Sequence, residues 1–293
     1  MNATSCFESV ERELRRRSQP RSGAAFHAYG GHEKPRCDRY VNSNHKTGSH
    51  LAHCLVSLLR SRNMSVCVGS SHVTHGFTPA ALSLNLVRNP FDMVASGYEY
   101  HRNAVQPEAW TLARTTAARA YVRGRCMPGA EAVLNESLGY RAALHVLDMS
   151  HGLLLESVRM HESDLPGMLS AAQSCREADG AAAAASDGAG TSPGGAAGGC
   201  VNMLLDDAMA DYGAAWARVV RALRLDASLG AASEWRAFAA TCDPTSTHSE
   251  HATNRTGRAA VIELLRHLDA EHLGSRLRAA EGALAALVTR AVQ

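Results

Sequence analysis

Two segments of the sequence each place a polar loop between a short apolar run and the start of a helix. They are residues 44–50 and residues 86–98. A loop at a helix start exposes backbone N–H groups, and the helix dipole adds about half a positive charge there. Such strand–loop–helix junctions are typical of open α/β sheets with parallel strands. Together the two junctions predict a ligand with two separate phosphate ends.

Strand and helix patterns alternate along the rest of the chain. Short apolar runs predict strands over residues 39–43, 65–69, 82–87 and 201–205. Helical periodicity covers residues 51–59, 107–172, 209–223 and the chain from about 258. A further helix begins near Asn89, which can cap it, with Pro90 at its first position. We therefore expect a single α/β domain, with a central, mostly parallel sheet flanked by helices and a helix-rich C-terminal half.

Composition marks the boundaries of this domain. Residues 1–37 are polar and interrupted by proline and glycine, so we expect a poorly ordered N-terminal lead-in. The domain then spans residues 38–293. Within it, residues 178–199 are almost entirely alanine, glycine, serine and aspartate, a composition that predicts a disordered insertion.

Net charge and hydropathy bear on the kind of partner. The formal net charge of +2 gives no general attraction to nucleic acid or to a membrane surface. No apolar run approaches the ~18 residues that span a bilayer. We expect no nucleic-acid partner and no transmembrane segment in this chain.

Cysteines and glycosylation sequons bear on the compartment. The spacing of the eight cysteines includes no C-x-x-C, which argues against a zinc ribbon. Cys54 and Cys67 are interpreted as buried thiols, whereas Cys175 and Cys200 flank the predicted insertion and are suited to close it as a disulfide. N-x-S/T sequons occur at Asn2, Asn63, Asn135 and Asn254. The compartment stays open: the secretory pathway or Golgi lumen if an anchor is missing from this chain, and the cytoplasm otherwise.

The first segment carries the side chains that bind phosphate. Gly48 lets the backbone approach an anion closely, and Lys46 brings a mobile positive charge. Thr47 and Ser49 bring hydroxyl donors. The G-x-x-x-x-G-K-[ST] loop of ATPases and GTPases is absent, because the lysine precedes the glycine. Taken alone, the segment is also compatible with a surface turn that carries a lysine.

The second segment places an arginine at a strand end. Arg88 ends a predicted strand, at the edge where open α/β sheets bind ligands. Ser96 follows two helical turns later. An arginine fork with a hydroxyl group is suited to holding a terminal phosphate. The plainer alternative is that Arg88 and Asp92 only cap the helix and Ser96 is solvated.

Together the two segments resemble the sulfotransferase family that uses 3′-phosphoadenosine 5′-phosphosulfate (PAPS). The 5′-phosphosulfate loop of that family has the pattern P-K-[ST]-G-[ST]-[ST], and residues 45–50 read His-Lys-Thr-Gly-Ser-His. Its 3′-phosphate element has the pattern R-[ND]-P-x-D-x-x-x-S-x-Y, and residues 88–98 match every fixed position. The acidic pair Asp206 and Asp207 after a predicted strand is a weaker similarity. The resemblance implies a P-loop NTPase-like sulfotransferase fold.

The resemblance also implies roles for the matching residues. Lys46 would contact the 5′-phosphate and the bridging oxygen, and would stabilise charge on the leaving group. Arg88 and Ser96 would hold the 3′-phosphate. Donors to the 5′-phosphate would be Thr47, Gly48 and Ser49.

Two positions depart from the family pattern. His50 stands where the family usually has serine or threonine, although a histidine can also donate a hydrogen bond. The arginine-lysine-glycine loop that covers the 3′-phosphate in the family has only a loose counterpart in residues 254–257, where Arg255 supplies the basic side chain.

Sulfuryl transfer to a hydroxyl group also needs a general base. By resemblance to the threonine-histidine element of cytosolic sulfotransferases, His72 is the first candidate. Alternatives are His75, Glu99 and His101. The spacing of the histidines does not suit zinc, because it lacks both helical i, i+4 geometry and a nearby carboxylate, so no metal is expected.

These observations favour a PAPS-dependent sulfotransferase that acts by in-line transfer on a hydroxyl group of a carbohydrate or small metabolite. A nucleotide kinase of related fold is one alternative, which the missing Walker glycine disfavours. The other is a non-catalytic protein that binds PAPS or another nucleotide, which the departure at His50 keeps open. The sequence does not identify the acceptor.

Overall fold

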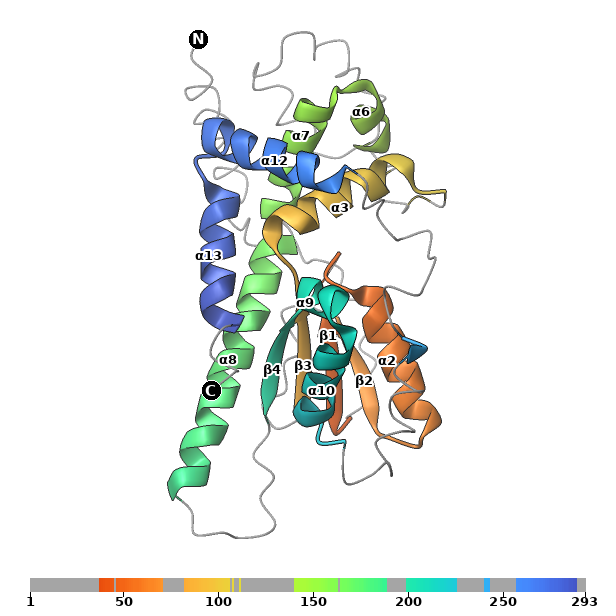
Figure 1. The fold of residues 1–293 in the computed structure, drawn as a ribbon, viewed down its shortest axis with the longest axis vertical. Helices are drawn as coiled ribbons and strands as arrows, with labels where there is room; N and C mark the ends of the chain where they lie inside the picture. Colours follow the sequence, from red (N-terminus) through yellow and green to blue (C-terminus); the bar gives the residue numbers. More distant parts are fainter. Residues whose placement is uncertain are drawn as a thin grey trace, which may run out of the picture. The chain divides into compact units, whose positions relative to one another are not determined.

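Four short apolar segments form one sheet in the computed structural model of the chain (Figure 1). The structure describes residues 37–44, 46–70, 82–105, 107, 111, 140–162, 164–188, 199–225, 240–242 and 257–288. The strands lie in the order β2-β1-β3-β4, and every neighbouring pair is parallel. They are β1 (Arg39–Ser43), β2 (Val66–Ser70), β3 (Leu82–Val87) and β4 (Cys200–Leu204). The expected α/β class with a parallel sheet flanked by helices is confirmed.

The described residues fall into two compact units within the region expected as one domain. The sheet unit draws on Arg36–Met93, Ser163–Ala252 and Ala279–Gln293. The helical unit draws on Val94–Glu162 and Thr253–Arg278.

One face of the sheet packs against an apolar layer of helices. These helices are α2 (Ser49–Ser61) and α10 (Tyr212–Ala222). Leu55 of α2, Leu84 of β3 and Trp216 of α10 belong to one buried cluster on this face. The helical spacing of the leucines in α2 follows from this contact, because one stripe of the helix must face the core.

The other face of the sheet carries a row of asparagines. Asn42, Asn85 and Asn202 lie directly beside one another on β1, β3 and β4. Asn85 Nδ2 donates to Asn202 Oδ1 at 2.8 Å, and Asn202 Nδ2 donates to the carbonyl oxygen of Ala172 in α8 (Asp164–Gly188) at 2.9 Å. Leaving a buried amide group without hydrogen-bond partners costs about 1–3 kcal/mol of stability. These bonds therefore favour this strand register and this position of α8 on the sheet.

Helix α8 differs from the expectation for residues 178–199. The helix continues to Gly188, so disorder is wrong for residues 178–188. Alanine has the highest helix propensity of all residues, and an alanine-rich run can extend a helix without burying apolar surface. Residues 189–198 lie outside the described part of the chain.

Three disulfides join segments of the sheet unit. The expected bond between Cys175 and Cys200 is confirmed and ties α8 to β4. The interpretation of Cys54 and Cys67 as thiols is wrong, because Cys54 is bonded to Cys242 and Cys67 to Cys37. The partners are 188 and 30 residues away along the chain. The spacing of cysteines along a sequence does not by itself show which of them pair, so these two bonds could not be predicted.

Among the described residues, the helical unit contains α3 from Val94 onward, the start of α13, and the helices α6, α7 and α12. Their bounds are Pro90–Asn103 for α3, Tyr140–Val146 for α6, Met149–Glu162 for α7, Arg258–His272 for α12 and Arg276–Val288 for α13. Helices α3 and α7 approach closely because each offers a glycine to a large side chain of the other. Tyr98 packs on Gly152, and Glu156 packs on Gly97.

Candidate functional site

The two predicted phosphate-binding segments follow neighbouring strands at the same edge of the sheet. Residues 44–49 follow β1 and Arg88 follows β3, and β1 and β3 pair in parallel. The chain leaves β1 toward β2 on one side and leaves β3 toward β4 on the other, so the strand order reverses between them. Open α/β sheets bind ligands outside the carboxyl ends of the strands at such a switch point.

The carbonyl group of Asn44 organises the loop after β1. It accepts hydrogen bonds from the Thr47 amide at 3.1 Å, the Thr47 hydroxyl at 2.9 Å and the Ser49 hydroxyl at 3.2 Å. The Thr47 hydroxyl in turn accepts from the Asn44 amide at 2.6 Å. Thr47 is fully buried. Its two donors therefore serve the loop, in contrast with the expectation that Thr47 donates to a phosphate.

This loop uses two backbone conformations of the left-handed region. Lys46 has φ 61° and Gly48 has φ 107°. A lysine rarely adopts this conformation, whereas glycine does so without steric cost. A Cβ atom on Gly48 would also lie 3.2 Å from Leu205 and 3.3 Å from Leu86. Glycine is therefore favoured at position 48 by its backbone angle, and the two leucines leave little room for a side chain.

Helix α2 begins directly after this turn, and no side-chain hydrogen bond caps its N-terminus. Gly48 is the N-cap residue, no side chain caps the helix, and its first turn contains no acidic residue. The Ala52 amide bonds to the Gly48 carbonyl oxygen at 2.9 Å and closes the first turn. By helix geometry, the backbone amides that precede Ala52, including those of the exposed Ser49 and His50, are directed toward the N-terminal end of the helix. An anion at this point would meet these donors and the positive end of the helix dipole.

Arg88 connects the loops that follow three strands. Its Nη1 donates to the Lys46 carbonyl oxygen at 3.0 Å, and its Nε lies 3.7 Å from Asp206 Oδ1. Asp206 belongs to α9 (Leu205–Ala210), which follows β4, and its Oδ2 accepts from the Asn89 amide at 3.1 Å. Arg88 is only 5% exposed, so these partners offset the loss of water around its charge. The structure thus brings the Lys46 loop and Arg88 together.

Helix α3 begins at Pro90, as the sequence predicts. Asn89 Oδ1 accepts a hydrogen bond from the Phe91 amide at 2.9 Å and supplies the predicted cap. Ser96 lies farther along α3, is buried, and belongs to the helical unit. The pairing of Ser96 with Arg88 around a 3′-phosphate stays a prediction.

Several predicted residues lie outside the described part of the chain. These are His72, His75 and Arg255. Of the other two candidate bases, Glu99 is half-buried on α3, whereas His101 is buried on the same helix.

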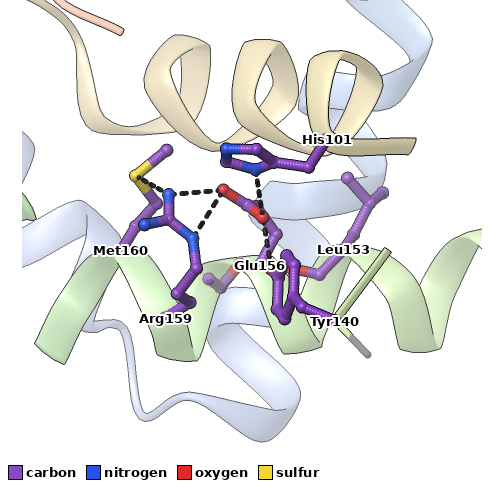
Figure 2. A network of polar contacts seen from close by, with 7 residues as sticks. His101, Tyr140, Leu153, Glu156, Arg159 and Met160 are labelled. Carbon is purple, nitrogen blue, oxygen red and sulfur yellow. Dashed lines mark hydrogen bonds and ion pairs between the residues drawn. The ribbon is translucent and has the colours of Figure 1, made fainter. Parts of the chain in front are cut away.

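His101 belongs to a buried polar network around Glu156 of α7 (Figure 2). Glu156 Oε2 accepts from the Tyr140 hydroxyl and lies 3.0 Å from His101 Nδ1. Its Oε1 accepts from Arg159 Nη2 at 2.7 Å and from Arg159 Nε at 3.1 Å. The side chains of both His101 and Glu156 are 0% exposed. His101 is therefore bound to Glu156 and presents no surface to an acceptor hydroxyl.

The charges in this network are mutually supporting. Burial opposes ionisation of Glu156, but the positive charges of Arg159 and His101 and their hydrogen bonds hold its pKa well below the ordinary 4.5. Burial and the negative charge of Glu156 raise the pKa of Tyr140 well above 10.0, so its hydroxyl stays protonated and donates. The hydrogen bonds and ion pairs of Glu156 thus connect α3, α6 and α7.

Sequence reasoning noted Asp206 only by similarity and missed Glu156. Glu156 does leave a signal, because it directly follows three leucines at positions 153–155. A carboxylate within an apolar helix face is buried only where it is paired and hydrogen-bonded. Such a residue therefore predicts partners on the neighbouring helices.

Among the described residues, no cluster of three or more His, Cys, Asp or Glu side chains is suited to hold a metal ion. No helix in the described ranges is both long enough and apolar enough to cross a membrane.

Comparison with known proteins gives no family assignment. No protein-family model, curated protein or solved structure matches the chain.

Replacing Gly97 by alanine should destabilise the protein, although the same change usually stabilises a helix. A Cβ atom at position 97 would clash with Glu156 Oε1 and would lie 2.5 Å from Met160 Cε. Glu156 cannot move aside without breaking its bonds to the neighbouring side chains. We expect a loss of about 1–3 kcal/mol in chemical denaturation. Gly282→Ala on α13 is the control, because no side chain of the described residues other than its chain neighbours lies within 4 Å of the new Cβ position, and a gain of about 0.5–1 kcal/mol is expected. Equal effects of the two variants would contradict the packing described.

Glu156→Gln should lower the free energy of unfolding by on the order of 3 kcal/mol at neutral pH, because it leaves Arg159 without its buried counter-charge. The folded-state pKa of Glu156 is depressed, so its contribution is complete above the ordinary value of 4.5 and declines as the pH falls below it. Denaturation curves at pH 7 and pH 4 should show the gap between wild type and variant shrinking in acid. Glu263→Gln, at an exposed position on α12, should have little effect at either pH. A gap that widens in acid would refute the assignment of a charged Glu156.

Proposed function

We propose that the chain is a PAPS-dependent sulfotransferase whose sheet unit has the P-loop-like sulfotransferase topology. The observation that carries the proposal is the 3.0 Å hydrogen bond from Arg88 Nη1 to the Lys46 carbonyl oxygen. It joins the two segments whose patterns resemble the 5′- and 3′-phosphate elements of that family. The junction lies at the strand-order switch point, where ligands of open α/β sheets bind.

The use of lysine in this chain gives independent support. Lysine occurs only at positions 34 and 46 among 30 basic residues, so arginine supplies nearly all the positive charge. The ammonium group is a compact point charge on a flexible stem, whereas guanidinium is a broad planar fork. Position 46 therefore has lysine in a chain that otherwise uses arginine almost throughout. It lies in the loop where a phosphate-binding point charge is proposed.

The residues fit the charge changes of sulfuryl transfer. The bond from sulfur to the bridging oxygen of the 5′-phosphate breaks as the acceptor oxygen bonds to sulfur, and the acceptor proton passes to a base. Negative charge then develops on the phosphate. The amides at the start of α2, which the fold holds in place before the reaction begins, would stabilise it together with the Lys46 ammonium group. Thr47 would support the loop from within rather than bind the phosphate.

The proposed base is His72, with His75 and Glu99 as alternatives. His101 fits this role poorly, because its Nδ1 faces Glu156 and its side chain is buried. The acceptor is proposed as a hydroxyl group of a carbohydrate or small metabolite.

A non-catalytic nucleotide-binding protein is the second candidate. The contacts of Arg88 favour it, since two sides of the guanidinium already face Lys46 and Asp206. In that case Arg88 serves to hold the two loops together, and the chain binds a nucleotide without transferring sulfate.

The role of Lys46 can be tested with 3′-phosphoadenosine 5′-phosphate (PAP) and isothermal titration calorimetry. Lys46→Arg should weaken PAP binding by at least about tenfold, or 1.4 kcal/mol, because the guanidinium fork does not reproduce the point charge in this tight loop. Lys34→Arg replaces the other lysine and should leave the affinity unchanged.

Transfer of label from labelled PAPS to a panel of hydroxyl acceptors then separates the candidates. Label transfer supports the sulfotransferase, and PAP binding without transfer to any acceptor supports the non-catalytic protein. Turnover of ATP without PAPS would favour the nucleotide kinase. Wild-type protein that does not bind PAP would exclude both PAPS-based proposals.

A further inference from the structure

The three disulfides of the sheet unit bear on where the chain folds. Their Cα–Cα separations are 5.8 Å for Cys37–Cys67, 5.7 Å for Cys54–Cys242 and 5.0 Å for Cys175–Cys200. These values lie within the ordinary range for disulfides. Disulfides form and persist in oxidising compartments, whereas glutathione keeps cytosolic thiols reduced. Three of them in one unit indicate folding in an oxidising compartment such as the lumen of the secretory pathway.

One of the four N-x-S/T sequons lies in the described part of the chain. It consists of Asn63, Met64 and Ser65, in the turn between α2 and β2. Asn63 and Ser65 are both exposed. The Asn63 amide donates to the Arg60 carbonyl at 2.9 Å, which fixes the backbone of the turn and leaves the asparagine side chain at the surface.

The turn lies at the far end of α2 from the proposed phosphate loop. Helix α2 has 13 residues, which at 1.5 Å per residue is about 20 Å of helix. Ser65 precedes β2, and its Oγ accepts from the Asp38 amide just before β1, so the sequon lies at the amino edge of the sheet. Lys46 and Arg88 lie at the carboxyl edge. A large group on Asn63 therefore leaves the proposed site accessible.

We infer that Asn63 is an N-glycosylation site. The acceptor is its exposed Nδ2, and the donor is an oligosaccharide linked to a lipid diphosphate. The anomeric carbon forms a bond to Nδ2 as its bond to the diphosphate oxygen breaks, and one amide proton balances the charge of the departing diphosphate. The inference rests on exposure, turn position and the disulfides together, and it is independent of the proposed sulfotransferase activity.

A purely conformational role is the competing explanation for Asn63. Its φ is 60°, and asparagine tolerates this left-handed conformation at a helix C-terminus better than most residues. Glycine tolerates it as well and has no amide side chain. Asn63→Gly therefore separates the two roles, since it keeps the turn and removes the acceptor.

The test is to produce the full chain in the secretory pathway of a eukaryotic cell and to map the purified, oxidised protein by peptide mass spectrometry. After digestion with an amidase that removes N-glycans, the peptide containing position 63 should carry aspartate in place of asparagine. On a denaturing gel, Asn63→Gly and Ser65→Ala should each migrate faster than wild type by the mass of one N-glycan. Ser65→Thr should migrate like wild type.

The mapping of wild-type protein needs no variant and so does not depend on variant folding. An unmodified Asn63 in secreted, folded protein would overturn the inference. Loss of one N-glycan's mass in Ser65→Thr would also overturn the inference, because that variant preserves the sequon. Free thiols at Cys37, Cys54 and Cys175 in the folded protein would contradict folding in an oxidising compartment, and with it the inference.

Discussion

The buried guanidinium group of Arg88 holds together the chain segments that follow β1, β3 and β4. It donates to the Lys46 carbonyl oxygen, which follows β1, and pairs with Asp206, which follows β4. Parallel strands end at the same edge, so a single side chain can reach all three loops. A charge that is 5% exposed is tolerated only with such partners. Arg88 therefore adds a contact from outside the loop to the bonds around Asn44 that hold the Lys46 loop in shape.

This arrangement explains how a small loop becomes suited to an anion. The Asn44 carbonyl collects three hydrogen bonds from Thr47 and Ser49, and Gly48 turns the backbone directly into α2. The start of α2 has neither a capping side chain nor an acidic residue in its first turn. Backbone donors held in place before a ligand arrives stabilise developing charge without further rearrangement. The same loop thus links fold stability with the proposed chemistry.

The sequence predicted the parallel sheet and the start of α3 well, because strand ends, caps and helical spacing are local signals. It did not predict what depends on distant partners. The bonds of Cys54 and Cys67, the pairing of Arg88 with Asp206, and the burial of Thr47 all involve the folded chain. Composition misled for residues 178–188, where alanine extends a helix. Glu156 left a local signal, since it follows three leucines, but its partners come from three helices.

The central claim is that the two loops form one site for a ligand with two phosphate ends. The most direct measurement compares the affinities of PAP and adenosine 5′-monophosphate for the wild-type chain by calorimetry. The two ligands differ only in the 3′-phosphate. A charge-assisted contact to that group predicts that PAP binds at least about tenfold more tightly. Equal affinities, or no binding of either ligand, would contradict the claim.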